Sequence, residues 1–399
     1  MTKPSSASAR KPEALFLSPE PPYPPVGGGP LRSASLLEYL SLQHSVDLVV
    51  FRDAGAPDPS AALPPGKVRN IDVLDLPFHS KTAPARLLRN FGRVIRGVPP
   101  LVDRFSGFER PLAALLSDRR YEVAIVEHFW CAAYIQQLRA SAKHIILDLH
   151  NIESVWHQTL SRGEAPLRAA ALKRFAAVAR QMEGKLFPQF DTILVPSDQE
   201  ARRVRSLAPS TRIVVYPNAL PEIPAPPRLE REEIAFSGNL EYEPNIQAVR
   251  FFCRRIWPLF RRRPNLKWKI IGKNPGAIRG LVAGDERIQL TGPVKDAVAE
   301  LAAAQIAVVP VLSGSGTRLK ILEAWAAATP VVSTSLGAEG LGIAGEHLII
   351  AGDPGDFAAK IVALLDSPAE RRRIGLAGRR LYEERFTWPA AWQCLSGIF

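Results

Sequence analysis

Residues 308–333 read VVPVLSGSGTRLKILEAWAAATPVVS, and their pattern is the strongest indication of fold in the chain. The apolar run at 306–312 predicts a strand that is buried on both faces. The chain then turns at 313–316, and residues 317–328 are expected to form a helix. A strand, a glycine-rich turn and a helix start bring free backbone N–H groups and the positive end of the helix dipole to one point. The stretch therefore predicts a phosphate-binding turn.

Two charged side chains strengthen this interpretation. Lys320 and Glu323 follow Gly316 at spacings of four and seven residues, which places all three on one helix face. A cation one turn into the helix and a carboxylate two turns in can hold a diphosphate and a sugar hydroxyl together. The alternative is an ordinary surface pair worth about 0.2–0.5 kcal/mol, with glycines that only turn the chain.

The size and composition are those of a soluble globular protein. A chain of 399 residues, 46% hydrophobic and 23% charged, predicts two large domains. No apolar run reaches the ~18 residues of a membrane span, and the run at 14–17 is too short for a signal peptide, so we expect a cytoplasmic protein. Cys131, Cys253 and Cys394 are too widely spaced to predict a disulfide framework or a zinc site.

The formal net charge of +12 favours anionic partners. Basic clusters occur at 254–255, 261–263 and 371–373, but no aromatic residues interleave with a basic stripe, so a nucleic-acid partner is not expected. A peripheral contact with the anionic inner face of the plasma membrane is one hypothesis. An ordinary solvated charged surface is the alternative.

Strands and helices are expected to alternate through the first half of the chain. Strands are predicted at residues 14–18, 46–51, 69–76, 121–127, 144–149, 192–196 and 212–216, and helices at 31–43, 84–117, 134–140, 166–186 and 198–207. Gly27, Gly28 and Gly29 lie between the first strand and its helix, where glycine lets the backbone approach a ligand. They lack the GxGxxG spacing of a dinucleotide fingerprint, and a flexible loop is the alternative.

His150 and Glu153 follow the strand predicted at 144–149. Open α/β sheets bind ligands beyond the carboxyl ends of their parallel strands, so both residues are site candidates. A histidine that only makes a local hydrogen bond is the alternative for His150.

The segment 219–232 contains four prolines and no apolar periodicity, which predicts a linker. After it, strands are expected at 234–236, 268–271, 288–290, 330–333 and 347–350, and helices at 245–261, 294–304 and twice within 356–386. This alternation predicts two parallel-sheet domains that face a ligand cleft. We expect an N-terminal acceptor-binding domain at 1–220, a C-terminal donor-binding domain at 221–385, and a segment at 386–399 that packs back toward the N-terminal domain.

Several motifs of the second half occur together in a fixed order. They are SGNL with YEPN at 237–245, IGKNP at 271–275, LTGPV at 290–294, GSGTRLKILEA at 314–324 and GAEGL at 337–341. In this order they resemble the C-terminal half of a GT-B glycosyltransferase of the group-1 (GT4-like) family, over residues 232–386. The first half is similar more weakly, at 27–29, DLHNIES (148–154), VPS (195–197) and YPN (216–218).

The resemblance implies an α/β GT-B fold of two Rossmann-like domains. It also implies a nucleoside-diphosphate sugar donor, a glycan or lipid-linked acceptor, and transfer with retention of anomeric configuration in cell-surface or exopolysaccharide biosynthesis. No cofactor or metal is implied, and the sequence contains no Asp-x-Asp motif. The alternatives are a non-catalytic relative that binds a nucleotide sugar or glycan, and a nucleotide-sugar epimerase on the same fold.

The chain departs from the family pattern at three positions. Glu323 matches the second glutamate of the paired-glutamate motif, which binds the ribose, but Ser315 stands where the first glutamate is expected. Many members carry an arginine and a lysine where this chain has Asn239 and Asn245. We therefore expect other groups to neutralise the diphosphate.

The resemblance assigns an expected role to each candidate residue. Arg318 and Lys320, with the N–H groups of Gly316 and Thr317, are expected to hold the diphosphate. His150 is expected near the anomeric carbon, as a hydrogen-bonding group and not as a nucleophile. The predicted catalytic residues are His150, Lys320 and Glu323, the donor-binding residues are Ser237, Gly238, Asn239, Gly272, Gly292, Val294, Gly314, Gly316, Thr317, Arg318, Glu339 and Gly340, and the acceptor-side residues are Gly27, Gly28, Gly29 and Glu153.

Overall fold

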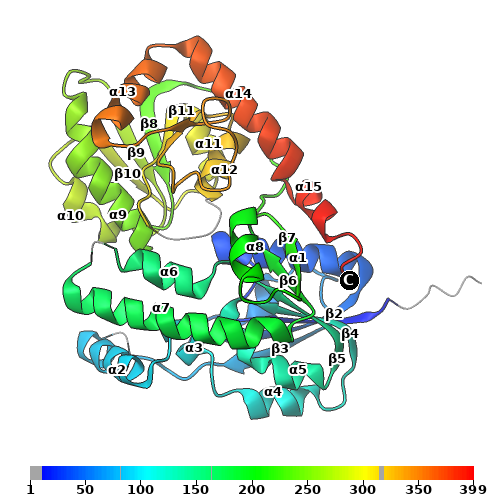
Figure 1. Ribbon diagram of the computed structural model, residues 1–399. Helices are drawn as coiled ribbons and strands as arrows, with labels where there is room; N and C mark the ends of the chain where they lie inside the picture. Colours follow the sequence, from blue (N-terminus) through cyan, green and yellow to red (C-terminus); the bar gives the residue numbers. More distant parts are fainter. Residues whose placement is uncertain (1–10, 81, 163, 314–318) are drawn as a thin grey trace, which may run out of the picture.

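The computed structural model describes residues 11–80, 82–162, 164–313 and 319–399. Two lobes are visible in Figure 1, each built on a parallel sheet with helices packed against it. The predicted fold class, two parallel-sheet α/β domains, is confirmed.

The N-terminal sheet has seven strands in the order β3-β2-β1-β4-β5-β6-β7, and all its neighbours are parallel. The strands are β1 (Glu13–Ser18), β2 (Ser45–Arg52), β3 (Asn70–Asp75), β4 (Tyr121–Glu127), β5 (Ala142–Asp148), β6 (Thr192–Val195) and β7 (Arg212–Val215). The main helices are α1 (Gly28–Gln43), α2 (Ala83–Arg96), α3 (Pro100–Arg104), α4 (Glu109–Leu116), α5 (Ile135–Arg139), α6 (Glu153–Leu160), α7 (Pro166–Leu186) and α8 (Asp198–Arg205). The strand order reverses between β1 and β4, and the loops that follow them flank this switch point.

The C-terminal sheet has six parallel strands in the order β10-β9-β8-β11-β12-β13. They are β8 (Arg231–Ser237), β9 (Lys267–Ile271), β10 (Ile288–Gly292), β11 (Ala304–Val309), β12 (Val331–Ser333) and β13 (Ile349–Ile350). The helices are α9 (Glu243–Phe251), α10 (Arg279–Val282), α11 (Ala297–Ala303), α12 (Leu319–Ala326), α13 (Pro354–Leu365), α14 (Pro368–Arg385) and α15 (Trp388–Trp392). Here the switch point lies between β8 and β11, and α12 follows β11.

Helices α12 and α14 pack closely against each other in the core of the C-terminal lobe. Trp325 on α12 is fully buried, and its indole donates a hydrogen bond to the backbone oxygen of His347 at 3.0 Å. A Cβ placed on Gly378 of α14 would lie 2.3 Å from Trp325 Cδ1. Only glycine therefore lets α14 pack this closely on α12, and that packing fixes the helix that carries Lys320 and Glu323.

Prolines explain two differences from the predicted elements. The helix expected at 245–261 begins at Glu243 and is α-helical only to Phe251, after which a π-turn and a 3₁₀ turn lead past Pro258. Pro258 has no N–H to continue an α-helical ladder. The strand expected at 306–312 ends at Val309 because Pro310 follows it. The predicted linker was also too long, since β8 begins at Arg231.

Two chain segments cross side by side between the lobes. The Leu220 N–H donates to the oxygen of Phe386 at 2.9 Å, and the Trp388 N–H donates to the oxygen of Leu220 at 2.8 Å. Beyond this crossing, α15 lies against the N-terminal lobe in Figure 1, and Trp392 Nε1 donates to the backbone oxygen of Ser35 at 3.1 Å. The last segment of the chain is thereby attached to α1.

Candidate active site

The carboxyl edges of the two sheets face each other across the interface between the lobes. A Cβ placed on Gly28, at the start of α1, would lie 3.6 Å from Leu319 Cδ1, at the start of α12. A Cβ on Gly340 would lie 3.4 Å from the Cβ of Ser197, which caps α8. The structure therefore brings the predicted acceptor-side glycines and the predicted donor-side helix into one region.

Lys320 and Glu323 are held by the neighbouring strand and helix. Glu323 Oε2 accepts a hydrogen bond from Ser237 Oγ at the end of β8, at 2.8 Å. Lys320 Nζ donates to Asn245 Oδ1 on α9 at 3.0 Å and lies 5.5 Å from the ring centroid of Phe236. They are not an isolated surface pair, because each is fixed by groups outside α12.

The environment of Glu323 suits a hydrogen-bond acceptor. Burial raises the pKa of its carboxyl group, while the Ser237 hydrogen bond and the charge of Lys320 oppose that shift. A carboxylate in such a site has already lost part of its hydration. A hydrogen bond from a ligand hydroxyl group therefore stabilises it.

Asn245, which stands where many family members carry a lysine, connects Lys320 to the loop after β8. Its Nδ2 donates to the backbone oxygen of Asn239 at 2.7 Å, while its Oδ1 accepts from Lys320. A Cβ on Gly238 would lie 2.7 Å from Asn245 Nδ2, and a Cβ on Gly272 would lie 1.8 Å from the oxygen of Gly238. The loops after β8 and β9 thus pack backbone against backbone, and Asn245 orients the lysine from them.

Four of the predicted donor-binding residues, Gly314, Gly316, Thr317 and Arg318, lie outside the described residues. Ser313, just before them, donates through Oγ to Gln247 Oε1 at 2.8 Å. Of the other candidates, Gly292 accepts a hydrogen bond through its backbone oxygen from the Gly272 N–H at 3.2 Å, and Val294 is half-buried after β10.

The loop that carries Glu339 and Gly340 lies next to the N-terminal domain. Burial, with a smaller contribution from the charge of Glu339, raises the pKa of Glu200 on α8 to about 7, although Ser197 and nearby arginines oppose the shift. The structure therefore places Glu339 and Gly340 close to α8, at the interface between the lobes.

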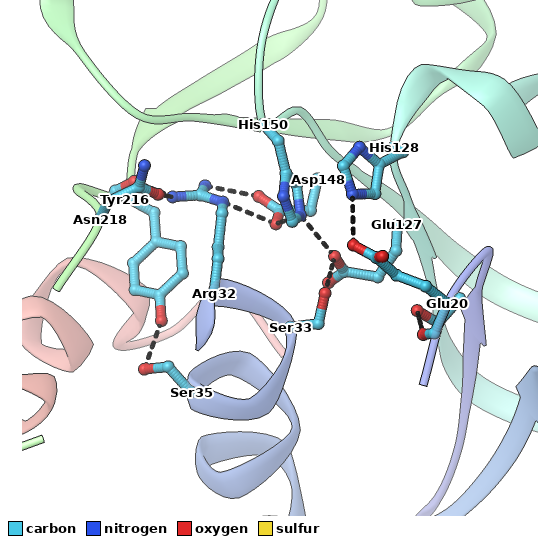
Figure 2. Close-up of polar contacts among 11 residues, drawn as sticks. Glu20, Arg32, Ser33, Ser35, Glu127, His128, Asp148, His150, Tyr216 and Asn218 are labelled. Atoms are coloured by element: carbon cyan, nitrogen blue, oxygen red, sulfur yellow. Dashed lines mark hydrogen bonds and ion pairs between the residues drawn. The ribbon is translucent and has the colours of Figure 1, made fainter. Parts of the chain in front are cut away.

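On the N-terminal side, a buried arginine connects α1 to the end of β5 and to the segment after β7 (Figure 2). Arg32, on the first turns of α1, donates to both carboxylate oxygens of Asp148, at 2.8 and 2.5 Å. Its third nitrogen, Nη1, donates to the oxygen of Tyr216 at 2.7 Å and to Asn218 Oδ1 at 2.9 Å. Both charged groups are buried, and the guanidinium also lies 4.5 Å from the ring centroid of Tyr216.

His150 is paired with two carboxylates in this cluster (Figure 2). Its Nε2 lies 2.7 Å from Glu127 Oε2 and 3.4 Å from Asp148 Oδ2, and Ser33 Oγ donates to the same Glu127 oxygen at 2.7 Å. Burial lowers the pKa of His150, but the hydrogen bonds and charges of Asp148 and Glu127 outweigh burial and raise it to about 9. His150 is therefore an imidazolium near neutral pH.

His128 lies over His150 and is electrostatically different from it. The ring centroids are 3.6 Å apart, and Trp130 stacks on the other side of His128 at 4.1 Å. Burial, followed by the charges of His150 and Arg32, holds the pKa of His128 well below its usual value, so this ring is neutral. Its backbone has φ of 61°, an unusual value for a histidine.

Glu20 and Gly29 complete the surroundings of His128. Glu20 Oε1 lies 3.9 Å from His128 Nε2. A Cβ on Gly29 would lie 2.2 Å from that carboxylate oxygen and 3.6 Å from His128 Nε2. Burial raises the pKa of Glu20, while the charges of His150 and of Lys273 in the C-terminal domain lower it. Side chains of both domains therefore act on this carboxylate.

Glu153 lies behind this cluster. Its Oε2 accepts a hydrogen bond from Trp130 Nε1 at 3.1 Å, and its Oε1 lies 3.2 Å from His157 Nε2. Glu153 is almost completely buried. Through Trp130 it supports the stacked face of His128.

Glu127, Asp148 and His150 place ligand atoms within 4.8 Å of one another, a spacing that a metal ion could use. However, Arg32 donates to both oxygens of Asp148, and Ser33 and His150 both bind Glu127 Oε2. A metal ion would have to displace Arg32 to reach Asp148. Arg32 and His150 already supply positive charge to this cluster, so the residues present do not fit a metal centre well.

Sequence reasoning did not single out Glu20, Arg32, Glu127 and His128. Glu127 ends β4 and His128 follows it, so the rule that selected His150 at the end of β5 also applies to them. Arg32 had no comparable signal, because an arginine within a helix is ordinarily a surface residue.

The raised pKa of His150 predicts how stability depends on pH. The folded protein keeps the imidazolium up to about pH 9, whereas an unfolded histidine loses its proton near pH 6.5. The contribution of His150 to stability is therefore complete below about pH 6.5 and is lost as the pH rises through 9. Urea unfolding between about pH 6 and 9.5 should show this loss, and His150→Gln should remove that part of it. An equal decline in both proteins would contradict the assignment.

Comparison with known proteins agrees with the two-domain fold. Residues 231–367 match the family model described as "Glycosyl transferases group 1", and residues 27–219 match the "Glycosyl transferase 4-like domain". A Klebsiella pneumoniae protein, the uncharacterized 44.6 kDa protein in cps region, is 25% identical over 87% of this chain and 89% of its own length. The MMP alpha-(1->4)-mannosyltransferase of Mycolicibacterium hassiacum is 40% identical, but over only 24% of each chain.

Solved structures share the whole fold at low sequence identity. Sucrose-phosphate synthase from Thermosynechococcus elongatus superposes with a TM-score of 0.72 at 18% identity, over 98% of both chains. HepE of Anabaena, solved with UDP and glucose, gives 0.64 at 13% identity, over 97% of this chain and 99% of its own. The two family models together extend over both domains, and the chain belongs to the group-1, GT4-like glycosyltransferases.

Proposed function

We propose that the protein transfers a sugar from a nucleoside-diphosphate sugar to a glycan or lipid-linked acceptor, with retention of anomeric configuration and without a metal ion. Sugar transfer itself follows from the family. The observation that carries the proposal is the placement of Lys320 and Glu323. Glu323 is fixed by the last residue of β8 and Lys320 by the helix that follows it, at the switch point of the C-terminal sheet.

In this proposal Lys320 binds the diphosphate and Glu323 binds a ribose hydroxyl. Negative charge develops on the diphosphate as the glycosidic bond breaks, and a fixed cation stabilises the transition state more than the bound substrate. Asn245 orients the ammonium group before the donor binds. The remaining phosphate contacts are assigned to Arg318 and to the N–H groups of Gly316 and Thr317.

The acceptor is assigned to the N-terminal side, next to Glu20, His128 and the glycines at the start of α1. The cationic His150 is held by Glu127 and Asp148 under the neutral His128, so we assign it a hydrogen-bonding role and not that of a nucleophile. Protein cations replace a metal in this scheme.

Two solved structures support the substrate classes, and one sequence relative supports the biosynthetic context. HepE was solved with UDP and glucose, and TarM of S. aureus, which superposes with a TM-score of 0.67 at 12% identity, was solved with UDP and saccharide ligands. The Klebsiella relative is a protein of a cps region. We assign this chain to cell-surface or exopolysaccharide biosynthesis on the cytoplasmic side of the membrane.

Thermal-shift measurements with nucleoside diphosphates test the donor site. A diphosphate at about 100 times its Kd should stabilise the protein by about 2.7 kcal/mol, without added metal and in the presence of EDTA. The matching donor sugar should then support transfer, and the anomeric configuration of the product should equal that of the donor. Stabilisation that requires a divalent metal, or an inverted product, would contradict the proposal. Binding without transfer to any acceptor would indicate a non-catalytic relative.

A further inference from the structure

Helix α2 presents an apolar face to solvent. Leu87, Leu88, Phe91 and Ile95 are each between 62% and 73% exposed. They follow one another at positions i, i+1, i+4 and i+8, so they share one side of the helix. Phe78, in the loop that precedes the helix, is 78% exposed. Single exposed apolar side chains are common on soluble proteins, but an apolar stripe along a whole helix is not.

The opposite, basic face of α2 is turned toward the protein. Arg93 is buried and its Nε donates to Asp103 at 2.8 Å. On the neighbouring helix α7, Arg174 Nε donates to the backbone oxygen of Val94 at 2.7 Å. These contacts fix the rotation of α2, with Arg93 turned inward and the apolar side turned outward. The helix is therefore oriented opposite to an ordinary surface helix.

The charges on α2 favour one class of occupant for this face. The helix carries Arg86, Arg89, Arg93 and Arg96 and no acidic residue. Arg86 and Arg96 are exposed and lie on the basic side of the helix, where Arg86 precedes Arg93 by two turns and Arg96 Nη2 also pairs with Asp103 Oδ1 at 2.9 Å. An apolar face on a helix whose charged residues are all arginines is complementary to a lipid surface with anionic head groups, because the apolar side chains enter the acyl boundary while the long arginine side chains extend toward the phosphates.

We propose that the apolar face of α2, defined by Leu87, Leu88, Phe91 and Ile95, docks the protein on an anionic lipid bilayer. The helix lies parallel to the surface and does not cross it. Among the described residues, no helix combines the length and apolar character that a membrane span requires. In Figure 1, α2 lies at the outer edge of the N-terminal lobe, away from the C-terminal domain. Docking there leaves the C-terminal lobe free to bind a donor from solution.

Sedimentation with vesicles tests this inference independently of any sugar transfer. The full chain should sediment with vesicles that contain about 30% phosphatidylglycerol, and binding to pure phosphatidylcholine should be at least tenfold weaker. The variant Leu87→Ser/Leu88→Ser/Phe91→Ser should lose at least tenfold in partitioning to the anionic vesicles. The control Leu42→Ser/Leu259→Ser/Leu376→Ser removes three other exposed leucines and should bind like the unmodified protein.

Additional measurements separate the possible outcomes. Unchanged melting temperature and circular dichroism of the α2 variant would show that the loss is not caused by unfolding, because the substituted side chains are exposed. Equal vesicle binding by the two triple variants would overturn the proposal. A dimer in light scattering that the α2 variant alone converts to a monomer, without vesicle binding by the unmodified chain, would also overturn it and would assign the face to a second copy.

Discussion

Replacing Arg32 with methionine is expected to lower the free energy of unfolding by about 3–5 kcal/mol. The substitution leaves the buried Asp148 carboxylate without the guanidinium that donates to both its oxygens, and it removes the hydrogen bonds to Tyr216 and Asn218. The loss is large because the remaining charge stays buried. Urea denaturation followed by tryptophan fluorescence measures it directly.

A surface pair of the same chemistry provides the control. Arg52 donates to both oxygens of Asp75 at 2.7 and 2.9 Å, but both residues are substantially exposed. Arg52→Met should lower the free energy of unfolding far less than Arg32→Met, because solvent screens an exposed pair. The double variant Arg32→Met/Asp148→Asn should recover part of the loss, because the unpaired charge is removed. Similar losses for Arg32→Met and Arg52→Met would contradict the role assigned to the buried pair.

Replacing either Lys320 or Glu323 with alanine is expected to reduce transfer by about 10²–10³-fold, the scale seen when one preorganised transition-state contact is removed. Lys320→Ala should act mainly on kcat, because the charge it stabilises develops during bond cleavage. Glu323→Ala should weaken nucleoside diphosphate binding as well, because the assigned ribose contact exists before the reaction. Steady-state kinetics together with titration calorimetry would separate these two effects.

Lys360 on α13 is the matched control for this experiment. Its Nζ lies 2.8 Å from Asp356 Oδ2 in an i,i+4 surface pair of the same lobe. Lys360→Ala should leave kcat and KM unchanged. Turnover close to that of the unmodified protein in both Lys320→Ala and Glu323→Ala would remove these residues from the active site, provided that melting temperatures are unchanged.

The fold could be predicted from the sequence because parallel strands that are buried on both faces appear as apolar runs between turn residues. This signal located β4, β5, β6 and β11 to within a few residues. Residues that stop backbone hydrogen bonding, such as Pro258 and Pro310, moved several boundaries. Helix α6 was not predicted, because its eight residues mix polar and aromatic side chains without a clear apolar period.

The site was predictable only where a residue directly follows a strand or belongs to a family motif. His150, Lys320 and Glu323 satisfy those conditions, and the structure shows what holds each of them. The partnership of Arg32 with Asp148 connects residues 116 positions apart, so no local pattern reveals it. The stacking of His128 on His150 likewise depends on β4 and β5 being neighbours in the sheet.

The doubled crossing at Leu220, Phe386 and Trp388 determines how the two halves of the molecule can move. Each segment is hydrogen-bonded to the other at the point of passage, so neither can swing independently. Any rotation of one lobe against the other would therefore have to bend both segments together.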